Sequence, residues 1–193
     1  KEKTEHMERT NAIRRKLVII GDSACGKTSL LSMFTLGNFP AVNLTFLDGQ
    51  AVEFALWDTA GLEDYARLRP LAYSNANIIL IGFSVEDLCS LNNVKCKWSK
   101  EATRLCPGVP VVLVGLKKDL REDPTTTRKI GESSLRFVTE HEGEIVAYEI
   151  GAKMYLECSS LSGEGVDTVF EIASRIALLA VRKVTGEGCC PIL

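Results

Sequence analysis

Residues 21–28 read G-D-S-A-C-G-K-T and match the G-x-x-x-x-G-K-[ST] pattern of phosphate-binding loops. In such a loop the backbone runs close to phosphate oxygens and points its N–H groups at them, which requires glycine. The motif follows the apolar run 17–20 and precedes the apolar-periodic stretch 29–34. This strand–loop–helix setting predicts a nucleotide site in which Lys27 reaches the outer phosphates and the Thr28 hydroxyl ligates Mg²⁺.

The composition is that of a single globular domain. The 193 residues are 46% hydrophobic and 25% charged, which is enough to bury one full core. A net charge of −2 gives no reason to expect nucleic acid as a partner. No apolar run approaches the ~20 residues of a membrane span, and the charged start of the chain is not a signal peptide. The cysteines show neither a C-x-x-C pair nor zinc spacing, and we interpret Cys25, Cys89, Cys96, Cys106 and Cys158 as buried, reduced thiols.

Apolar runs alternate with helix-periodic segments, which predicts an α/β fold with a mostly parallel six-stranded sheet, helices on both faces and ligand at the carboxyl ends of the strands. The predicted strands span residues 16–20, 44–47, 51–57, 77–83, 109–115 and 154–157, and the predicted helices span 26–36, 90–105, 145–150 and 166–183. Asp48-Gly49 indicates a hairpin turn, and the polar stretch 121–135 is expected to form a surface insertion. We divide the chain into a disordered lead-in (1–13), one domain (14–181) and a tail (182–193).

Polar residues follow several of the predicted strands. Asp58-Thr59-Ala60-Gly61 comes directly after strand 51–57, where Asp58 can hold Mg²⁺ through water and the Gly61 N–H can meet the terminal phosphate. Lys117-Lys118-Asp119 follows strand 109–115 and resembles the N/T-K-x-D guanine motif of GTP-binding proteins. The carboxylate of Asp119 can accept hydrogen bonds from two adjacent N–H groups on guanine, a pair that adenine lacks.

Three further features complete the predicted base site. The stem of Lys117 covers the face of the base. Glu157-Cys158-Ser159-Ser160 follows the last predicted strand and resembles the E-x-S-A loop that caps the base, with the Ser160 N–H near the guanine oxygen. Phe39, just before Pro40, matches an aromatic residue that packs on the base edge.

Together these motifs resemble the Ras superfamily of small GTPases and, within it, the Rho family, with fungal Rho-type proteins most similar. The resemblance covers about residues 14–193, and the insertion 121–135 is what separates Rho proteins from other small GTPases. The segments that carry it are GDSACGKTSLL (21–31), LWDTAGLEDYARLRPLAYS (56–74), VGLKKDLRED (114–123) and YLECSSLSGEGV (155–166).

The resemblance implies a signalling switch with GTP/GDP and Mg²⁺ as cofactors, in which GTP holds two loops in an active conformation and hydrolysis releases them. It implies signalling to polarity, actin cytoskeleton or cell-wall machinery. The implied partners are a guanine-nucleotide exchange factor, a GTPase-activating protein, a GDP-dissociation inhibitor and effector proteins. The residues carried over as nucleotide-binding are Gly21, Asp22, Ser23, Ala24, Cys25, Gly26, Lys27, Thr28, Ser29, Phe39, Asp58, Gly61, Lys117, Asp119, Leu120, Ser159 and Ser160. The metal ligands are Thr28 and Asp58, and the catalytic positions are Lys27, Gly61 and Leu62.

Two departures from the family affect the hydrolysis apparatus. Leu62 stands where the family has the Gln that orients the attacking water, and Leu has no donor or acceptor for this task. Ser23 stands where most Rho proteins have Gly, and its side chain intrudes on space needed by that Gln and by an activator's arginine. Both changes predict slow hydrolysis, since loss of arginine help alone forfeits on the order of 10³–10⁵ in rate. In the guanine motif, Leu116 replaces the usual Asn or Thr and removes a polar brace to the phosphate loop.

The first switch is short. Only residues 41–57 separate Pro40 from Asp58, and the predicted hairpin uses most of them. Thr45 is predicted on the hairpin strand, so we do not assign it the role of the family's effector Thr. Three explanations account for the residues that are missing from the first switch relative to the family: a true deletion, an unusual splice product or a gene-model error. A true deletion removes a Mg²⁺ ligand, quickens nucleotide exchange and abolishes effector docking.

Cys190-Pro191-Ile192-Leu193 forms a C-a-a-X box, in which Leu favours geranylgeranylation of Cys190. One lipid and the thin basic patch Arg182-Lys183 bind a membrane only marginally, so Cys189 is a candidate palmitoyl acceptor. We expect a lipid-anchored protein at the cytoplasmic face of the plasma membrane, with a cytosolic pool.

Two hypotheses of function stay open, a membrane-anchored GTPase switch and a non-hydrolysing GTP-binding module that recruits partners. Leu62 and Ser23 favour the module, whereas the family resemblance favours the switch. A metabolic P-loop kinase has little support, because no second phosphate-acceptor site is apparent and the guanine motifs would go unexplained.

Overall fold

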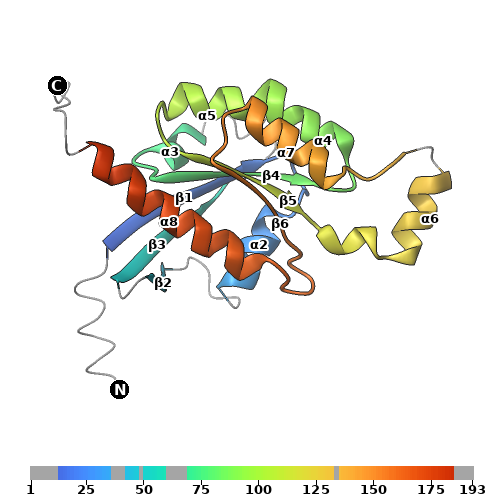
Figure 1. Cartoon of the computed structure of the whole chain (residues 1–193), viewed down its shortest axis with the longest axis horizontal. Coiled ribbons are helices and arrows are strands. Elements are labelled where there is room, and N and C mark those ends of the chain that lie inside the picture. The colour runs from blue at the N-terminus through green and yellow to red at the C-terminus, as the bar shows by residue number, and fades with distance from the viewer. Residues whose placement is uncertain (1–12, 36–41, 48–49, 60–68, 133–134, 185–193) are drawn as a thin grey trace, which may run out of the picture.

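The computed structural model describes residues 13–35, 42–47, 50–59, 69–132 and 135–184. A six-stranded sheet of order β2-β3-β1-β4-β5-β6 forms its centre (Figure 1). The strands are β1 (Ile13–Gly21), β2 (Val42–Leu47), β3 (Gln50–Asp58), β4 (Ile78–Ser84), β5 (Val111–Leu116) and β6 (Met154–Glu157). Neighbouring strands run parallel except β2, which pairs antiparallel with β3. The predicted α/β fold class is therefore confirmed.

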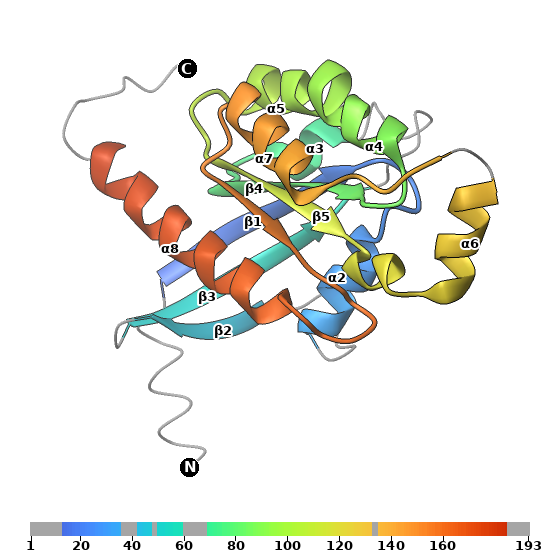
Figure 2. The ribbon, with the colours of Figure 1, turned by 45° about the vertical axis from the view of Figure 1, so that its right-hand side comes forward.

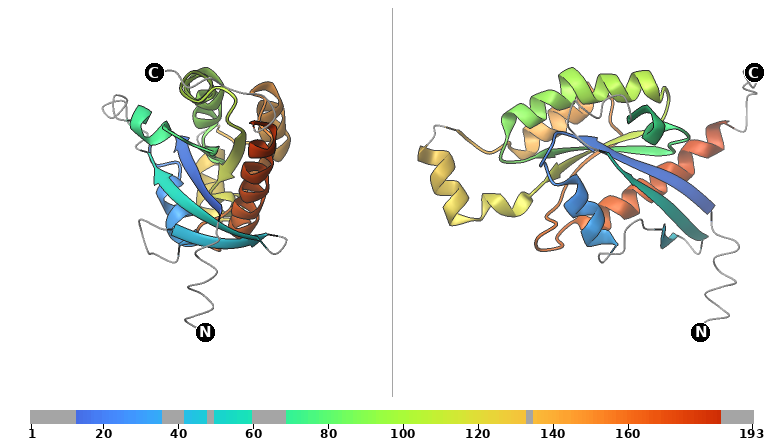
Figure 3. Two further views of the ribbon diagram at one scale, coloured as in Figure 1. Left: turned by 90° about the vertical axis from the view of Figure 1, so that its left-hand side faces the viewer. Right: turned by 180° about the vertical axis from the view of Figure 1, so that it is seen from behind.

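Helices cover both faces of the sheet (Figures 1 and 3). One face carries α2 (Lys27–Phe34) and α8 (Val166–Val184), and the other carries α3 (Arg69–Tyr73), α4 (Leu88–Asn93), η2 (Val94–Trp98), α5 (Ser99–Leu105) and α7 (Glu140–Glu149). Each face of the sheet has its own hydrophobic core. In β1, Leu17 and Ile19 belong to the core under α2 and α8, and Val18 and Ile20 belong to the core on the opposite face. Because strand side chains alternate between faces, a strand covered on both sides needs a continuous apolar run.

Several element boundaries differ from the predictions. β1 begins at Ile13 instead of residue 16, and its Arg14 pairs with Glu53 on β3 (Nε–Oε2 2.5 Å), so the strand is three residues longer at its start than predicted. α7 begins at Glu140, before the predicted start at 145, because Thr139 and Glu142 form a capping box. The first helix is shorter than predicted, and the short helix α3 was not predicted at all.

The helix predicted over 90–105 contains a π-helical turn. α4 passes into η2, which ends at the fully buried Trp98, and α5 continues from there. The prediction of five buried thiols is wrong for two of them, because Cys89 and Cys96 on this segment are exposed to solvent. Cys25, Cys106 and Cys158 are buried.

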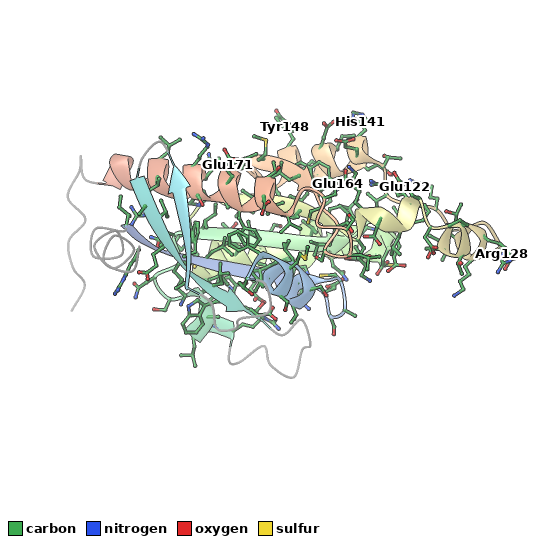
Figure 4. All side chains as sticks on the ribbon, turned by 90° about the horizontal axis from the view of Figure 1, so that it is seen from below. Glu122, Arg128, His141, Tyr148, Glu164 and Glu171 are labelled. Atoms are coloured by element: carbon green, nitrogen blue, oxygen red, sulfur yellow. The ribbon has the colours of Figure 1, made fainter. Side chains whose placement is uncertain are left out.

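The stretch predicted as a surface insertion contains a 3₁₀ turn, η3 (Lys118–Arg121), and a helix, α6 (Pro124–Glu132). None of the α6 residues is buried, and Figure 4 shows Arg128 at the far end of the molecule from α8. Asp123 accepts hydrogen bonds from the backbone N–H and the hydroxyl of Thr126 (2.8 and 2.6 Å), which stabilises the first turn of α6. Within the described residues, no helix has the length and apolar character needed to cross a membrane.

Candidate functional site

The carboxyl ends of the parallel strands carry the predicted motifs. The phosphate loop follows β1, Asp58 ends β3, the guanine motif follows β5 and Ser159-Ser160 follows β6. Figure 2 shows the connections after β1, β5 and β6 on the right-hand side of the sheet. The structure thus brings together the candidate residues that it describes. Five candidates lie outside the described residues, namely Phe39, Gly61, Leu62, Cys189 and Cys190.

The phosphate loop has a backbone that depends on glycine. Gly21 (φ +143°), Ala24 (φ +59°) and Gly26 (φ +113°) all have positive φ. A Cβ added to Gly21 would lie 2.1 Å from the carbonyl oxygen of Gly82 on β4, so this approach excludes any side chain. Cys25 is buried beneath the loop, with its Sγ 3.6 Å from the same oxygen. The loop therefore rests directly on the backbone of β4.

Gly21→Ala is expected to lower the free energy of unfolding by roughly 3 kcal/mol or more, because it combines backbone strain with a clash against fixed backbone. Gly108→Ala is the matched control. Gly108 also has positive φ (+79°), but its added Cβ meets nothing within 4 Å. We expect a loss of only about 1 kcal/mol there. Urea denaturation of both variants under identical ligand conditions measures the difference, and equal losses would contradict the predicted clash.

Lys27 opens α2 with a buried ammonium group. The residue is 5% exposed, and its Nζ donates a hydrogen bond to the backbone carbonyl of Asp22 at 2.5 Å and lies 3.8 Å from the Cys25 sulfur. These contacts direct the positive charge into the loop. Ser23, in contrast, is exposed at the tip of the loop.

Thr28 and Asp58 provide the hard oxygen atoms that Mg²⁺ prefers. The Thr28 hydroxyl donates to Asp58 Oδ2 at 2.5 Å. The other carboxylate oxygen, Asp58 Oδ1, is buried without a hydrogen-bond partner among the described residues. Because burying an unpaired carboxylate oxygen is costly, this atom fits a bound cation. Two oxygen-bearing side chains are enough for Mg²⁺, since this ion takes few protein ligands and completes its shell with water and phosphate.

The predicted guanine motif is braced by two side chains. Lys117 has a left-handed backbone (φ +62°), and its Nζ bonds to Glu86 Oε1 at 2.8 Å. The fully buried Ser159 donates from Oγ to Asp119 Oδ1 at 2.5 Å, while the same Oγ accepts two backbone N–H groups of its own loop. Ser159 thereby orients the Asp119 carboxylate. Leu120 N–H closes the turn onto the Lys117 carbonyl at 3.0 Å, and Ser160 lies half-buried directly after Ser159.

The phosphate loop and the guanine motif lie side by side. A Cβ added to Gly26 would lie 3.6 Å from Leu116 Cβ and 3.7 Å from Lys117 Cγ, so the space between the two segments would hold about one methyl group. Leu116 is 1% exposed and belongs to the core beneath α2 and α8. Cys25 of the phosphate loop belongs to the same core, so a buried apolar residue stands where the family has a polar brace.

An ion pair holds the two base loops together. Arg121, which follows Leu120, forms a two-fold contact with the Glu157 carboxylate and donates to the Val138 carbonyl at 2.6 Å. Tyr155 donates to Glu157 Oε1 at 2.5 Å. Burial raises the pKa of Glu157, but the hydrogen bonds from Arg121 and Tyr155 outweigh burial and hold this pKa below its ordinary value. The ionised carboxylate thus fixes the end of β6 next to the guanine motif.

Sequence reasoning missed Glu86, Asn93, Trp98 and Arg121, all of which contact the predicted loops. Their hydrogen-bond partners lie 31 to 76 residues away along the chain, so no local pattern reveals these contacts. The apolar character of Trp98 gives no sign in the sequence of a contact with the phosphate loop.

Comparisons with known proteins agree with this arrangement. A sequence model of the Ras family matches residues 16–178. The GTP-binding protein rho2 of Schizosaccharomyces pombe is 52% identical over 96% of this chain and 100% of that protein. The GTP-binding protein RHO2 of Saccharomyces cerevisiae is 53% identical over 94% of this chain and 98% of that protein. The GTP-binding protein RHO1 of the same yeast is 49% identical, with 92% and 90% covered.

Proposed function

The chain belongs to the Ras family of GTP-binding proteins and, within it, to the Rho type, and from this membership we propose that it is a signalling switch that binds GTP and GDP with Mg²⁺. The observation that carries the proposal is that the phosphate loop lies beside the guanine motif, with Cys25 and Leu116 in one core and room for about one methyl group between Gly26 and Lys117. This placement joins a phosphate-binding loop to a base-binding motif, so one nucleotide can occupy both.

The described residues divide the binding task between them. Lys27 and the N–H groups around Gly21–Thr28 receive the phosphates, and Asp119, oriented by Ser159, accepts the N–H pair of guanine. Thr28 and Asp58 hold Mg²⁺, which neutralises phosphate charge when it is bound. GTP hydrolysis then proceeds by in-line attack of water, with Lys27 stabilising the charge that develops on the phosphate.

Hydrolysis in this chain is proposed to be slow. Leu62 cannot orient water, and the exposed Ser23 adds a side chain to the tip of the loop that faces the phosphates. These two residues favour a second candidate function, a non-hydrolysing GTP-binding module that recruits partners and is controlled by abundance or lipidation.

The nucleotide that the purified protein carries separates the two functions. Chromatography of the released nucleotide, followed by single-turnover hydrolysis of GTP, is the decisive experiment. Bound GTP that persists for hours supports the module, and GDP with measurable turnover supports the switch. Bound adenine nucleotide, or no nucleotide at all, would overturn guanine binding itself.

Membership of the Rho type suggests regulators and effectors as partners of this chain. The short first switch limits which of these proteins can bind. α2 ends at Phe34 and β2 already begins at Val42, so residues 35–41 are all that connects the two elements. Thr45 pairs with Val52 inside the β2–β3 hairpin, as its predicted strand position requires. We propose that Mg²⁺ has one protein ligand fewer than in the family, that nucleotide exchange is fast, and that effectors which grip the first switch do not bind.

Membrane attachment is proposed from the motif Cys190-Pro191-Ile192-Leu193, with Cys189 as a second acylation site. Cys190→Ser is expected to move the protein from the membrane pellet to the supernatant, because it removes the prenyl acceptor on which the second lipid depends. Cys189→Ser is the matched control and should weaken attachment only in part. Fractionation of cells expressing each variant measures the effect, and membrane retention of Cys190→Ser would refute a prenyl anchor.

A further inference from the structure

Two side chains of the helical layer hold the phosphate loop from outside. Trp98 Nε1 donates to Asp22 Oδ1 at 2.7 Å, and Asn93 Nδ2 donates to Asp22 Oδ2 at 2.8 Å. Both carboxylate oxygens of Asp22 are thus engaged by donors that lie more than 70 residues further along the chain. The backbone carbonyl of the same residue accepts the hydrogen bond from Lys27 Nζ. Asp22 therefore links the helical layer to the phosphate-binding lysine.

The π-helical turn explains how two donors five residues apart reach one carboxylate. In an α-helix of 3.6 residues per turn, residues five apart point about 140° away from each other. η2 (Val94–Trp98) begins directly after Asn93 and ends at Trp98. Its i→i+5 backbone hydrogen bonds make this turn wider than a turn of an α-helix. Asn93 and Trp98 can then face the same group. The irregular turn is therefore what makes the two-donor contact geometrically possible.

The indole of Trp98 is fixed by its own surroundings. It is fully buried, and the Arg69 guanidinium and Lys97 Nζ lie 5.1 and 4.1 Å from its ring centroid. Glu101 fixes Arg69 in turn through two hydrogen bonds of 2.8 and 2.9 Å. An indole held in this way presents its N–H in one direction, so its hydrogen bond costs little further ordering.

We propose that Asn93 and Trp98 are positioning residues for the bound nucleotide, which hold Asp22 and through it the phosphate loop in the arrangement that retains GDP and GTP. The inference rests on the proposed function, because it needs a nucleotide in the loop. Ala24 holds a left-handed backbone (φ +59°), which is costly for a residue with a side chain, and the flanking Gly21 and Gly26 add conformational freedom, so external support has a task to perform. Loss of either donor should speed nucleotide release without removing any group that touches the nucleotide.

Exchange of the side chains at positions 22 and 93 tests the contact between Asp22 and Asn93. Asn93→Asp places a second carboxylate against Asp22, and we expect the release of a fluorescent GDP analogue to quicken about tenfold or more. The double variant Asn93→Asp with Asp22→Asn restores one donor and one acceptor between the two positions. Its release rate should fall back toward that of wild type, at least about threefold below that of Asn93→Asp alone. Trp98→Phe keeps a ring in place but removes the N–H, and should quicken release about tenfold.

Ser174→Ala is the matched control for a general loss of stability. It removes a buried hydrogen bond, from Ser174 Oγ to the Phe170 carbonyl at 2.7 Å, in α8 on the other face of the sheet, so its release rate should equal that of wild type. Failure of the double variant to recover, with Trp98→Phe at the wild-type rate, would overturn the positioning role alone. Acceleration by Ser174→Ala equal to that of Trp98→Phe would do the same. A wild-type protein that does not retain the analogue would overturn both this inference and the proposed function.

Discussion

Lys27→Ala is expected to lower the affinity for GTP and GDP by roughly three orders of magnitude, the loss of about two hydrogen bonds between charged groups. The ammonium group is 5% exposed and is aimed into the loop by the Asp22 carbonyl. A cation that is already desolvated and oriented gains most of its interaction energy when the phosphates arrive. Titration with a fluorescent GDP analogue measures the loss.

The matched control is Lys153→Ala, which removes an equal charge from an exposed residue just before β6. Lys153 precedes the strand, whereas the site lies beyond the carboxyl ends, so the control should bind GDP as the wild type does. A drop in affinity of less than tenfold for Lys27→Ala, or an equal drop in the control, would show that the phosphates do not depend on this ammonium group.

The sheet could be predicted from the sequence because its strands carry their signal locally. The run 17–20 is apolar throughout since β1 is buried on both faces, and β6 (Met154–Glu157) has the predicted bounds. The residues at the strand ends were found for a related reason. In a parallel sheet the carboxyl ends share one edge, so Asp58 and Asp119 had to lie near the phosphate loop once their strands were assigned.

The parts that could not be predicted depend on contacts between distant segments. Asp22 faces Asn93 and Trp98 because a π-helical turn brings the two donors together, and nothing in 90–105 distinguishes such a turn from a regular helix. Arg121 and Glu157 pair across the base loops from positions 36 residues apart. Leu116 looked like the loss of a polar brace, yet it is buried in the same core as Cys25 of the phosphate loop, so apolar burial takes the place of that brace. Periodicity reports which face of an element is buried, but it does not report which polar group that face meets.

Ser23→Gly combined with Leu62→Gln is expected to raise hydrolysis in the presence of a Rho-type GTPase-activating protein by on the order of 10³–10⁵-fold over the unchanged chain. The Gln supplies the donor and acceptor that orient the attacking water, and the Gly clears the tip of the loop for the activator's arginine. Neither change should alter GDP affinity much, because the groups that hold the nucleotide are Lys27, the loop N–H groups and Asp119. Single-turnover hydrolysis of preloaded GTP, with and without the activating protein, measures the rate.

Leu62→Met is the control, since Met has similar volume but no amide, and it should leave hydrolysis slow. Each single variant should recover less than the double variant, because water orientation and arginine access are separate requirements of one transition state. Rapid hydrolysis by the unchanged chain would refute the proposed impairment. A double variant that binds GTP but still hydrolyses it slowly would instead place the defect in the short connection 35–41 and its effect on Mg²⁺. Lys27, Thr28 and Asp58, the other residues at the phosphate end of the site, are all present in this chain and would not account for the slow rate.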